Sequence, residues 1–476
     1  MPDRLDIQSQ ARRVAREFNS GDVVALGPGM PCSVPAVMPV DVPVYFLADS
    51  GALGYAADVS PESSSAAGLA VDSGGQWAFI KPGGTFLSTV DLAAMLRVGQ
   101  VATAVIQPAW IAPAGDLIHW TPHRTTAAAP ELPAVGASAD LANGARRVIA
   151  MMSHTSAEGS PNIVEHPVSP TGGAGRVDLI VTDVAVLRAE GGGLTLAELA
   201  PGWRVDDVAA ITGVPLSSAA DLKEIDLGLP QLAPVSKVFA SGLDALADMP
   251  DGVVVNIDGF AGPGGMPHYL MVALRDRGAK ELTIISNTAG LARVINFGTP
   301  PGLRAIDHSI LVDNNQVKKA IASYPVSPSA STPTSFELAY QRGEVELEVV
   351  PQGTLAERIR AGGAGVAAFY TPTAAGTLLA EGKETKVIDG VEYVLELALR
   401  ADYCIIRGHK ADTLGNVVYK GTSRNFNPIM ATSAGITVVE VDEIVAPGEL
   451  DPEAIVTPGV YIDRIVLRPA DFSPYD

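Results

Sequence analysis

Short runs of apolar, β-branched residues alternate with amphipathic segments along the chain. The runs at 42–47, 178–186 and 436–441 have the composition of buried strands. The segments 10–18 and 269–277 place apolar residues at helical intervals and end near glycine or aspartate. Strands and helices that alternate through glycine loops are typical of βαβ units. The pattern therefore predicts an α/β fold with mostly parallel sheets.

Two strand-to-glycine-loop segments resemble each other and lie about half a chain apart. The first is GDVVALGPGMP at 21–31, and the second, at 251–267, begins DGVVVNIDGF and ends GPGGMP. Their closing prolines are 236 residues apart. A second pair, GDLIHW at 115–120 and GNVVY at 415–419, is 300 residues apart, so the later half carries extra residues. The repeats indicate two duplicated domains rather than a solenoid.

Length and composition agree with this organisation. The chain has 476 residues, of which 47% are hydrophobic and 18% charged, which suffices for several buried cores. The 48 glycines and 36 prolines predict many tight turns. We expect a first domain at 1–215, a linker at 216–234 and a second domain at 235–476.

Charge and cysteine content exclude several classes of partner. The 33 basic and 53 acidic side chains give a formal net charge of −20, which repels nucleic-acid phosphates and anionic membrane surfaces. We therefore expect no nucleic-acid or membrane partner. Cys32 and Cys404 form no CxxC motif, and the amino terminus shows no export signal. These features favour a cytoplasmic protein.

Candidate binding groups lie in the two glycine loops. Loops of this kind can present backbone N–H groups to anions, and they contain Gly27, Gly29, Gly259, Gly264 and Gly265. Neither loop has the GxGxxG or GxxxxGK[ST] pattern of nucleotide-binding proteins. On the pattern alone, a purely structural turn accounts for each loop at least as well as a ligand site.

Asp49 is the candidate for chemical catalysis. It follows the apolar run at 42–47, so it stands at the carboxyl end of a predicted strand, where open α/β sheets bind ligands. The sequence Asp49-Ser50-Gly51 is also ordinary turn chemistry. The chain has no HExxH or GxSxG motif, so the sequence predicts neither a zinc site nor a serine hydrolase.

Several motifs, in consistent order, resemble the family I coenzyme A transferases, such as the 3-oxoacid CoA-transferases. The motifs of the A-type half of that family lie in the later half of the chain, at 349–365, 368–373 and 424–432. The motifs of the B-type half lie in the earlier half, at 83–97, 144–155 and 181–186. Fused relatives commonly place the A-type half before the B-type half, so the chain resembles a fusion in reversed order.

The resemblance implies a fold and a set of site residues. It implies two related open α/β domains with the active site between them. In the family, a glutamate of a Ser-Glu-Asn-Gly loop attacks the acyl-CoA carbonyl and later carries CoA as a thioester. Asp49 occupies that position here and is one methylene shorter. The residues implied to bind the oxyanion are Gly259, Gly264 and Gly265, and those implied to contact CoA or substrate are Gly27, Gly29, Gly83, Gly84 and Asn287.

The chain also departs from the family pattern in the second glycine loop. Asp258 replaces the first glycine of Gly-Gly-Phe, and one additional residue precedes Pro267. Both changes are expected to reposition the N–H groups of this loop. The segment 291–308 is longer than the family leads us to expect and is a candidate for reshaping the acyl pocket.

The resemblance implies transfer of CoA between a short acyl-CoA, such as succinyl-CoA, and a 3-oxoacid or related carboxylate. The CoA thioester is then a substrate, and no metal or other cofactor is expected. Because Asp49 replaces glutamate, two further functions stay open. One is hydrolysis of an acyl-CoA or a cyclic β-dicarbonyl compound with Asp49 as general base, and the other is non-catalytic CoA binding. The sequence leaves open a homodimer or a higher homo-oligomer.

Overall fold

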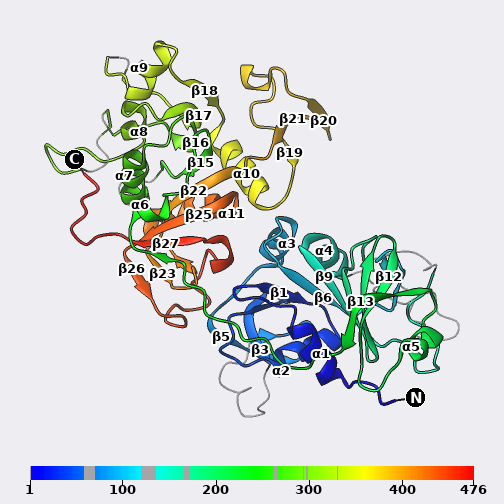
Figure 1. Cartoon of the computed structure of the whole chain (residues 1–476). Coiled ribbons are helices and arrows are strands. Elements are labelled where there is room, and N and C mark those ends of the chain that lie inside the picture. The colour runs from blue at the N-terminus through cyan, green and yellow to red at the C-terminus, as the bar shows by residue number, and fades with distance from the viewer. Residues whose placement is uncertain are drawn as a thin grey trace. The chain divides into compact units, whose positions relative to one another are not determined.

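The chain folds into two compact units, Met1–Val235 and Ser236–Asp476 (Figure 1). They are called here the first unit and the second unit. The structure is a computed structural model, and it describes residues 2–57, 70–118, 136–165, 172–260, 265–292, 294–295, 299–329 and 331–475.

The first unit is built on one mixed sheet. Its strands are β1 (Val23–Leu26), β2 (Tyr45–Ala48), β3 (Ala52–Ala57), β4 (Ala70–Val71), β5 (Trp77–Phe86), β6 (Thr103–Ile106), β9 (Arg147–Met151), β10 (Leu179–Val181), β11 (Ala185–Glu190), β12 (Gly193–Leu199) and β13 (Leu216–Glu224). They are ordered β13-β12-β11-β10-β9-β6-β1-β2-β3-β5-β4. The central strands β10, β9, β6, β1 and β2 run parallel, whereas antiparallel pairs flank them on both sides.

Short helices and one small hairpin complete the first unit. The helices are α1 (Ile7–Ala15), α2 (Val34–Val37), α3 (Thr89–Arg97), α4 (Ser138–Gly144) and α5 (Val205–Ile211), and the hairpin pairs β7 (Trp110–Ile111) with β8 (Leu117–Ile118). Side-chain caps fix two helix starts, because Asp6 accepts from Ser9 N–H at 2.7 Å and Ser88 accepts from Asp91 N–H at 3.2 Å.

The second unit is built on a fully parallel sheet. Its strands are β14 (Val238–Phe239), β15 (Val254–Ile257), β16 (Leu282–Thr288), β17 (Val317–Tyr324), β18 (Glu346–Val349), β22 (Ala401–Arg407), β25 (Ala434–Val441) and β27 (Arg464–Leu467). Their order is β14-β27-β25-β22-β15-β16-β17-β18, and every pair is parallel. Two small sheets accompany it, formed by β19 (Ala368–Thr371), β20 (Thr385–Ile388) and β21 (Val391–Leu397), and by β23 (Lys410–Asp412), β24 (Val417–Val418) and β26 (Glu443–Val445).

Helices cover both faces of the second sheet, which gives three layers (Figure 1). The helices are α6 (Gly242–Ala245), α7 (His268–Arg277), α8 (Ser309–Asp313), α9 (Ser335–Gln341), α10 (Gln352–Gly363) and α11 (Asn427–Thr432). The core on one face joins α6, α7, α8 and α9, and includes Ile284 of β16. The core on the other face joins α10 and α11, and includes Ile285. Alternate residues of each strand therefore enter different cores, as a period of two requires.

The α/β fold predicted from the sequence is confirmed, and the internal repeat has a structural counterpart. β1 and β15 each lie beside the next long parallel strand of the chain, β2 and β16. The later echo also matches, because β7–β8 and β23–β24 are hairpins that follow β6 and β22.

Two local predictions are wrong. Residues 216–224 of the expected linker form β13, which pairs with β12 in the first sheet; polar side chains hid a strand that is exposed along most of its length. The apolar run 178–186 is two strands rather than one, because the chain reverses at Thr182–Val184 between β10 and β11. The hydroxyl of Thr182 supports that reversal by donating to Ala185 O and accepting from its N–H, both at 3.0 Å.

A glycine pair in α10 tests the packing of the second unit. A Cβ at Gly362 would lie 1.9 Å from Leu399 O, whereas a Cβ at Gly353 in the same helix would meet nothing within 4 Å. We expect Gly362→Ala to destabilise the protein by about 1–3 kcal/mol or more. Gly353→Ala should instead stabilise it by about 0.5–1 kcal/mol. Urea denaturation of both variants measures the difference, and equal midpoints would contradict the packing.

Candidate active site

Asp49 lies in the turn after β2, with its side chain exposed. Its backbone is held by Ser73, whose hydroxyl accepts from Asp49 N–H at 3.1 Å and donates to Leu26 O at 2.6 Å. Gly51 completes the turn with a φ of 97°, and a Cβ there would lie 2.2 Å from Leu87 O. The turn therefore needs glycine, and it presents a carboxylate at the carboxyl edge of the parallel strands.

The first glycine loop lies beside this turn, because β1 is the parallel neighbour of β2. Gly27 N–H donates to Val105 O at 2.9 Å, and Met30 N–H donates to Gln107 Oε1 at 2.7 Å. A Cβ at Gly29 would lie 2.2 Å from the same Gln107 oxygen, and Gly29 has a φ of 89°. The loop is thus close to Asp49 along the sheet edge, and part of its hydrogen-bonding capacity is already used internally.

Gly83 and Gly84 lie in β5 and have a clear packing role. Gly83 has a φ of 85°, and a Cβ at Gly84 would lie 2.7 Å from Leu53 O and 2.8 Å from Gly54 O. The close approach of β3 and β5 therefore requires glycine at position 84. Their contact with CoA stays a prediction.

Cys32 lies near the Asp49 turn but does not suit nucleophilic chemistry. Burial raises the pKa of its thiol to about 12, and the charge of Asp72 adds to the rise. Only the thiolate is a good nucleophile, so Cys32 stays inert at neutral pH. Tyr55 is buried nearby, and its hydroxyl has no hydrogen-bond partner among the described residues.

The second glycine loop follows β15 and is crowded on one side. A Cβ at Gly259 would lie 2.3 Å from Ser286 Oγ, 2.6 Å from His308 Cε1 and 2.9 Å from Thr288 Oγ1. Three polar side chains therefore converge on a position that only glycine fits. Gly265 is buried at the other end of the loop, and Gly264 lies outside the described residues.

Asn287 does not join that cluster. It lies between Ser286 and Thr288 in β16, and alternate strand residues face opposite sides of the sheet. Asn287 is therefore on the face covered by α10 and α11, with Ile285. It is 2% exposed, and its Oδ1 has no partner among the described residues.

Two histidines, which no sequence motif singled out, are buried at this edge of the second sheet. Neither ring nitrogen of His268 or His308 has a hydrogen-bond partner among the described residues. Burial, with smaller contributions from Arg468 and Arg407, lowers the pKa of His268 to about 3. Burial also lowers the pKa of His308. Both imidazoles are therefore neutral at physiological pH.

Two buried carboxyl groups lie at the same edge. Glu440 accepts from Leu270 N–H at 2.8 Å at the start of α7. Burial raises its pKa to about 7, although Arg407 opposes the rise. Burial also raises the pKa of Asp258 to about 8. The second unit thus combines neutral imidazoles with carboxyl groups that titrate near neutral pH.

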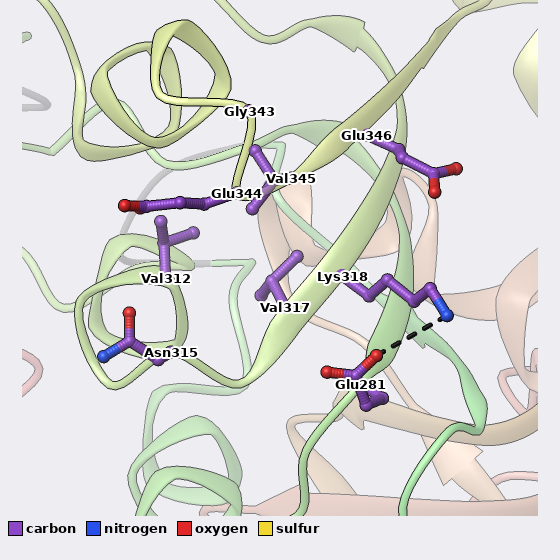
Figure 2. Close-up of a pocket in the computed structure, with 9 residues that line it drawn as sticks. All are labelled: Glu281, Val312, Asn315, Val317, Lys318, Gly343, Glu344, Val345 and Glu346. Carbon is purple, nitrogen blue, oxygen red and sulfur yellow. Dashed lines mark ion pairs between the residues drawn. The ribbon is translucent and has the colours of Figure 1, made fainter.

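A separate pocket of about 440 Å³ lies where β16, β17 and β18 begin (Figure 2). Its apolar floor includes Val312, Val317 and Val345, and Lys318 and Glu281 form an ion pair of 3.5 Å at its side. None of the residues predicted to act chemically lines this pocket. It opens at the amino ends of the strands, whereas Asp258 and Gly259 lie at a carboxyl end.

Comparison with known proteins decides the family. The coenzyme A transferase family model matches residues 7–210 and 241–468, most of both units. The chain belongs to the coenzyme A transferase family. The resemblance inferred from the motifs is therefore confirmed at the level of the family, as is the prediction of an enzyme of the CoA-transferase type.

Curated relatives of this coenzyme A transferase each match about half of it. The A-type chain of the 3-oxoadipate CoA-transferase of Pseudomonas putida is 45% identical over 232 residues, covering 49% of this chain and 94% of the relative. The A-type chain of a probable succinyl-CoA:3-ketoacid coenzyme A transferase of Bacillus subtilis is 45% identical over 233 residues, covering 49% and 90%. The alpha chain of the acetate CoA-transferase of Escherichia coli is 42% identical over 224 residues, covering 47% and 94%.

Solved structures of CoA-transferases show a weaker likeness. An acyl-CoA transferase of Escherichia coli O157:H7 has a TM-score of 0.43 at 20% identity, covering 52% of this chain and 49% of that one. Glutaconate coenzyme A-transferase of Acidaminococcus fermentans has a TM-score of 0.40 at 22% identity, covering 49% and 76%. These scores are low, so the description of each unit rests on its own strand topology.

Several predictions about this coenzyme A transferase stay predictions. They include the roles of the individual site residues, the location of the active site between the two halves, the cytoplasmic location and the independence from cofactors. Among the described helices, none combines the length and the apolar character needed to cross a membrane.

The tie between Ser73 and Asp49 can be tested in the coenzyme A transferase reaction. Ser73→Ala removes the hydroxyl that joins Asp49 N–H to Leu26 O, so the turn is free to shift. A displacement near 1 Å at a reacting group costs up to about 100-fold, and we expect kcat to fall about 10- to 100-fold. Ser156→Ala, which removes a hydroxyl from an exposed turn elsewhere in the first unit, should leave kcat unchanged. Equal kcat values in the two variants would show that Ser73 does not position Asp49.

Proposed function

We propose that this chain transfers CoA between a short acyl-CoA, such as succinyl-CoA, and a 3-oxoacid or related carboxylate. The observation that carries the proposal is the exposed Asp49 carboxylate, held by its backbone at the carboxyl edge of parallel strands in a chain of this family. The names of the relatives, which include 3-oxoadipate and succinyl-CoA:3-ketoacid transferases, support the choice of substrates.

We further propose that the chain is a fusion in reversed order, with a B-type first unit and an A-type second unit. The matches of the family model to both halves support a pair of related units. The A-type motifs at 349–365 and 424–432 support the assignment of the second unit, as does the similarity of half the chain to A-type relatives. A single chain keeps both units at high effective concentration whichever unit comes first.

The proposed reaction passes through covalent intermediates on Asp49. A carboxylate oxygen of Asp49 attacks the acyl-CoA carbonyl, and the CoA thiolate leaves to give an acyl–aspartyl anhydride. The thiolate then attacks the aspartyl carbonyl and releases the first carboxylate, which leaves an aspartyl-CoA thioester. The acceptor carboxylate attacks this thioester, and CoA returns to the new acyl group through the same two steps in reverse. Asp49 is regenerated as a carboxylate.

Each tetrahedral step develops a negative oxygen that needs hydrogen-bond donors. The proposed donors are the backbone N–H groups of Gly259, Gly264 and Gly265, each worth up to about 3–4 kcal/mol of transition-state stabilisation. Gly27, Gly29, Gly83, Gly84 and Asn287 are the proposed contacts to CoA or substrate. Acidic net charge does not oppose this role, because local backbone donors bind an anion without regard to the charge of the whole chain.

A trapping experiment tests the proposal. The protein is incubated with succinyl-CoA, treated with borohydride or hydroxylamine, and analysed by intact mass. We expect a covalent adduct on Asp49 and transfer of CoA to a 3-oxoacid. Asp49→Asn should abolish both, because an amide is a poor nucleophile, whereas Asp206→Asn on the exposed start of α5 should retain both.

Other outcomes identify the other functions. Release of free CoA without an acceptor and without an adduct would support hydrolysis with Asp49 as general base. CoA binding without turnover would support a non-catalytic protein. Full turnover by Asp49→Asn would remove Asp49 from the mechanism.

A further inference from the structure

The second glycine loop is tied to the rest of the second unit by two buried side chains. Asp258 Oδ1 accepts from Phe260 N–H at 2.8 Å, and Asp258 Oδ2 accepts from Asn427 Nδ2 at 2.9 Å. The same Asn427 Nδ2 donates to Gly265 O at 2.9 Å. One side-chain pair therefore contacts the backbone at both described ends of the loop.

Asn427 is itself fixed from two further directions. Its Oδ1 accepts from the backbone N–H of Arg407 in β22 at 3.0 Å, and its Nδ2 donates to Ser423 O at 2.8 Å. It is the first residue of α11, and both Asn427 and Asp258 have no exposed surface. A fully hydrogen-bonded, buried pair of this kind is rigid, because moving either partner leaves buried polar groups unpaired.

We propose that Asp258 and Asn427 are positioning residues that set the conformation of the second glycine loop, and with it the direction of its backbone N–H groups toward the oxyanion. This inference rests on the proposed transferase function. It also explains the departure at position 258: the carboxyl group is directed into the protein toward Asn427, where it holds a loop that is one residue longer than the family pattern.

The surroundings of Asp258 make its proton state sensitive to alkaline pH. The titratable groups that face it are Cys404 of β22 and Tyr419 beyond β24, and burial raises the pKa of both. His308, beside Gly259, is neutral, and the Arg407 side chain pairs with Asp442 at 2.6 Å. Without a facing cation among the described residues, burial dominates and raises the pKa of Asp258 to about 8.

The sign of the pH effect follows from charge. Below its pKa, Asp258 is neutral and does not repel a developing oxyanion at the adjoining loop. Above about pH 8 it becomes a buried anion next to that loop, and two negative charges in a region of low dielectric repel each other. The rate of transfer should therefore fall as pH rises through about 8, and this fall should depend on the Asp258 carboxyl group.

Two variants test the inference, with kcat, KM for succinyl-CoA and the pH profile as measurements. Asp258→Asn keeps the shape but turns an amide donor toward Asn427 Nδ2. Asp258→Gly removes the side chain, while Asn427 keeps its bonds to Gly265 O and Ser423 O. For both we expect kcat to fall about 10- to 100-fold with little change in KM, and the fall in rate near pH 8 to disappear.

Asp412→Asn is the matched control. Asp412 is also buried, also bonds an asparagine side chain, Asn416 Nδ2 at 2.7 Å, and also accepts from nearby backbone N–H groups, but it does so in the β23–β24 turn. Burial raises its pKa as well. We expect this variant to keep the kcat and the alkaline fall of the wild-type protein.

The outcomes separate the inference from the proposed function. A wild-type protein that transfers no CoA would overturn the proposed function, and the inference with it. Normal transfer by the wild-type protein, with wild-type kcat and pH profile in folded Asp258→Asn or Asp258→Gly, would overturn only the inference. Loss of the native fold in both variants would also overturn it, because the pair would then act on stability and not on the loop.

Discussion

The backbone polar groups at the carboxyl ends of the parallel strands must find partners outside the sheet, because the strand ladder stops there. In this protein the partners are side chains from distant segments. Ser73 joins the ends of β1 and β2, and the pair of Asp258 and Asn427 joins the end of β15 to the start of α11. The positions of the proposed nucleophile and of the proposed oxyanion donors both depend on these contacts.

The two units use this constraint in different surroundings. The first unit exposes its carboxylate, Asp49, so that the group stays accessible to a substrate. The second unit buries its polar groups, and burial keeps the imidazoles of His268 and His308 neutral. Each buried polar atom without a partner costs about 1–3 kcal/mol, so their concentration at one sheet edge indicates a region selected for more than stability.

The sequence predicted the features that depend on local pattern. Apolar runs indicated the buried strands, and the end of one run placed Asp49 at a strand terminus. It did not predict β13, because an exposed strand has no apolar face to reveal it. It also did not predict the roles of Ser73 and Gln107, whose partners are fixed only when β4 and β6 take their places in the sheet. Contacts of this kind depend on strand order, which a local pattern does not contain.

Position 258 shows how far a family pattern can guide an interpretation. Read along the chain, an aspartate in place of glycine suggests only that the loop has changed. Its partner, Asn427, is 169 residues away and lies in a motif with no sequence signal of a contact. The structure joins the two, and the departure then becomes a compensating pair: the longer loop gains a second anchor, and the anchor brings a carboxyl group whose charge depends on pH. A substitution in a family motif is therefore best interpreted together with the residue it contacts, because that contact decides whether chemistry is lost or repositioned.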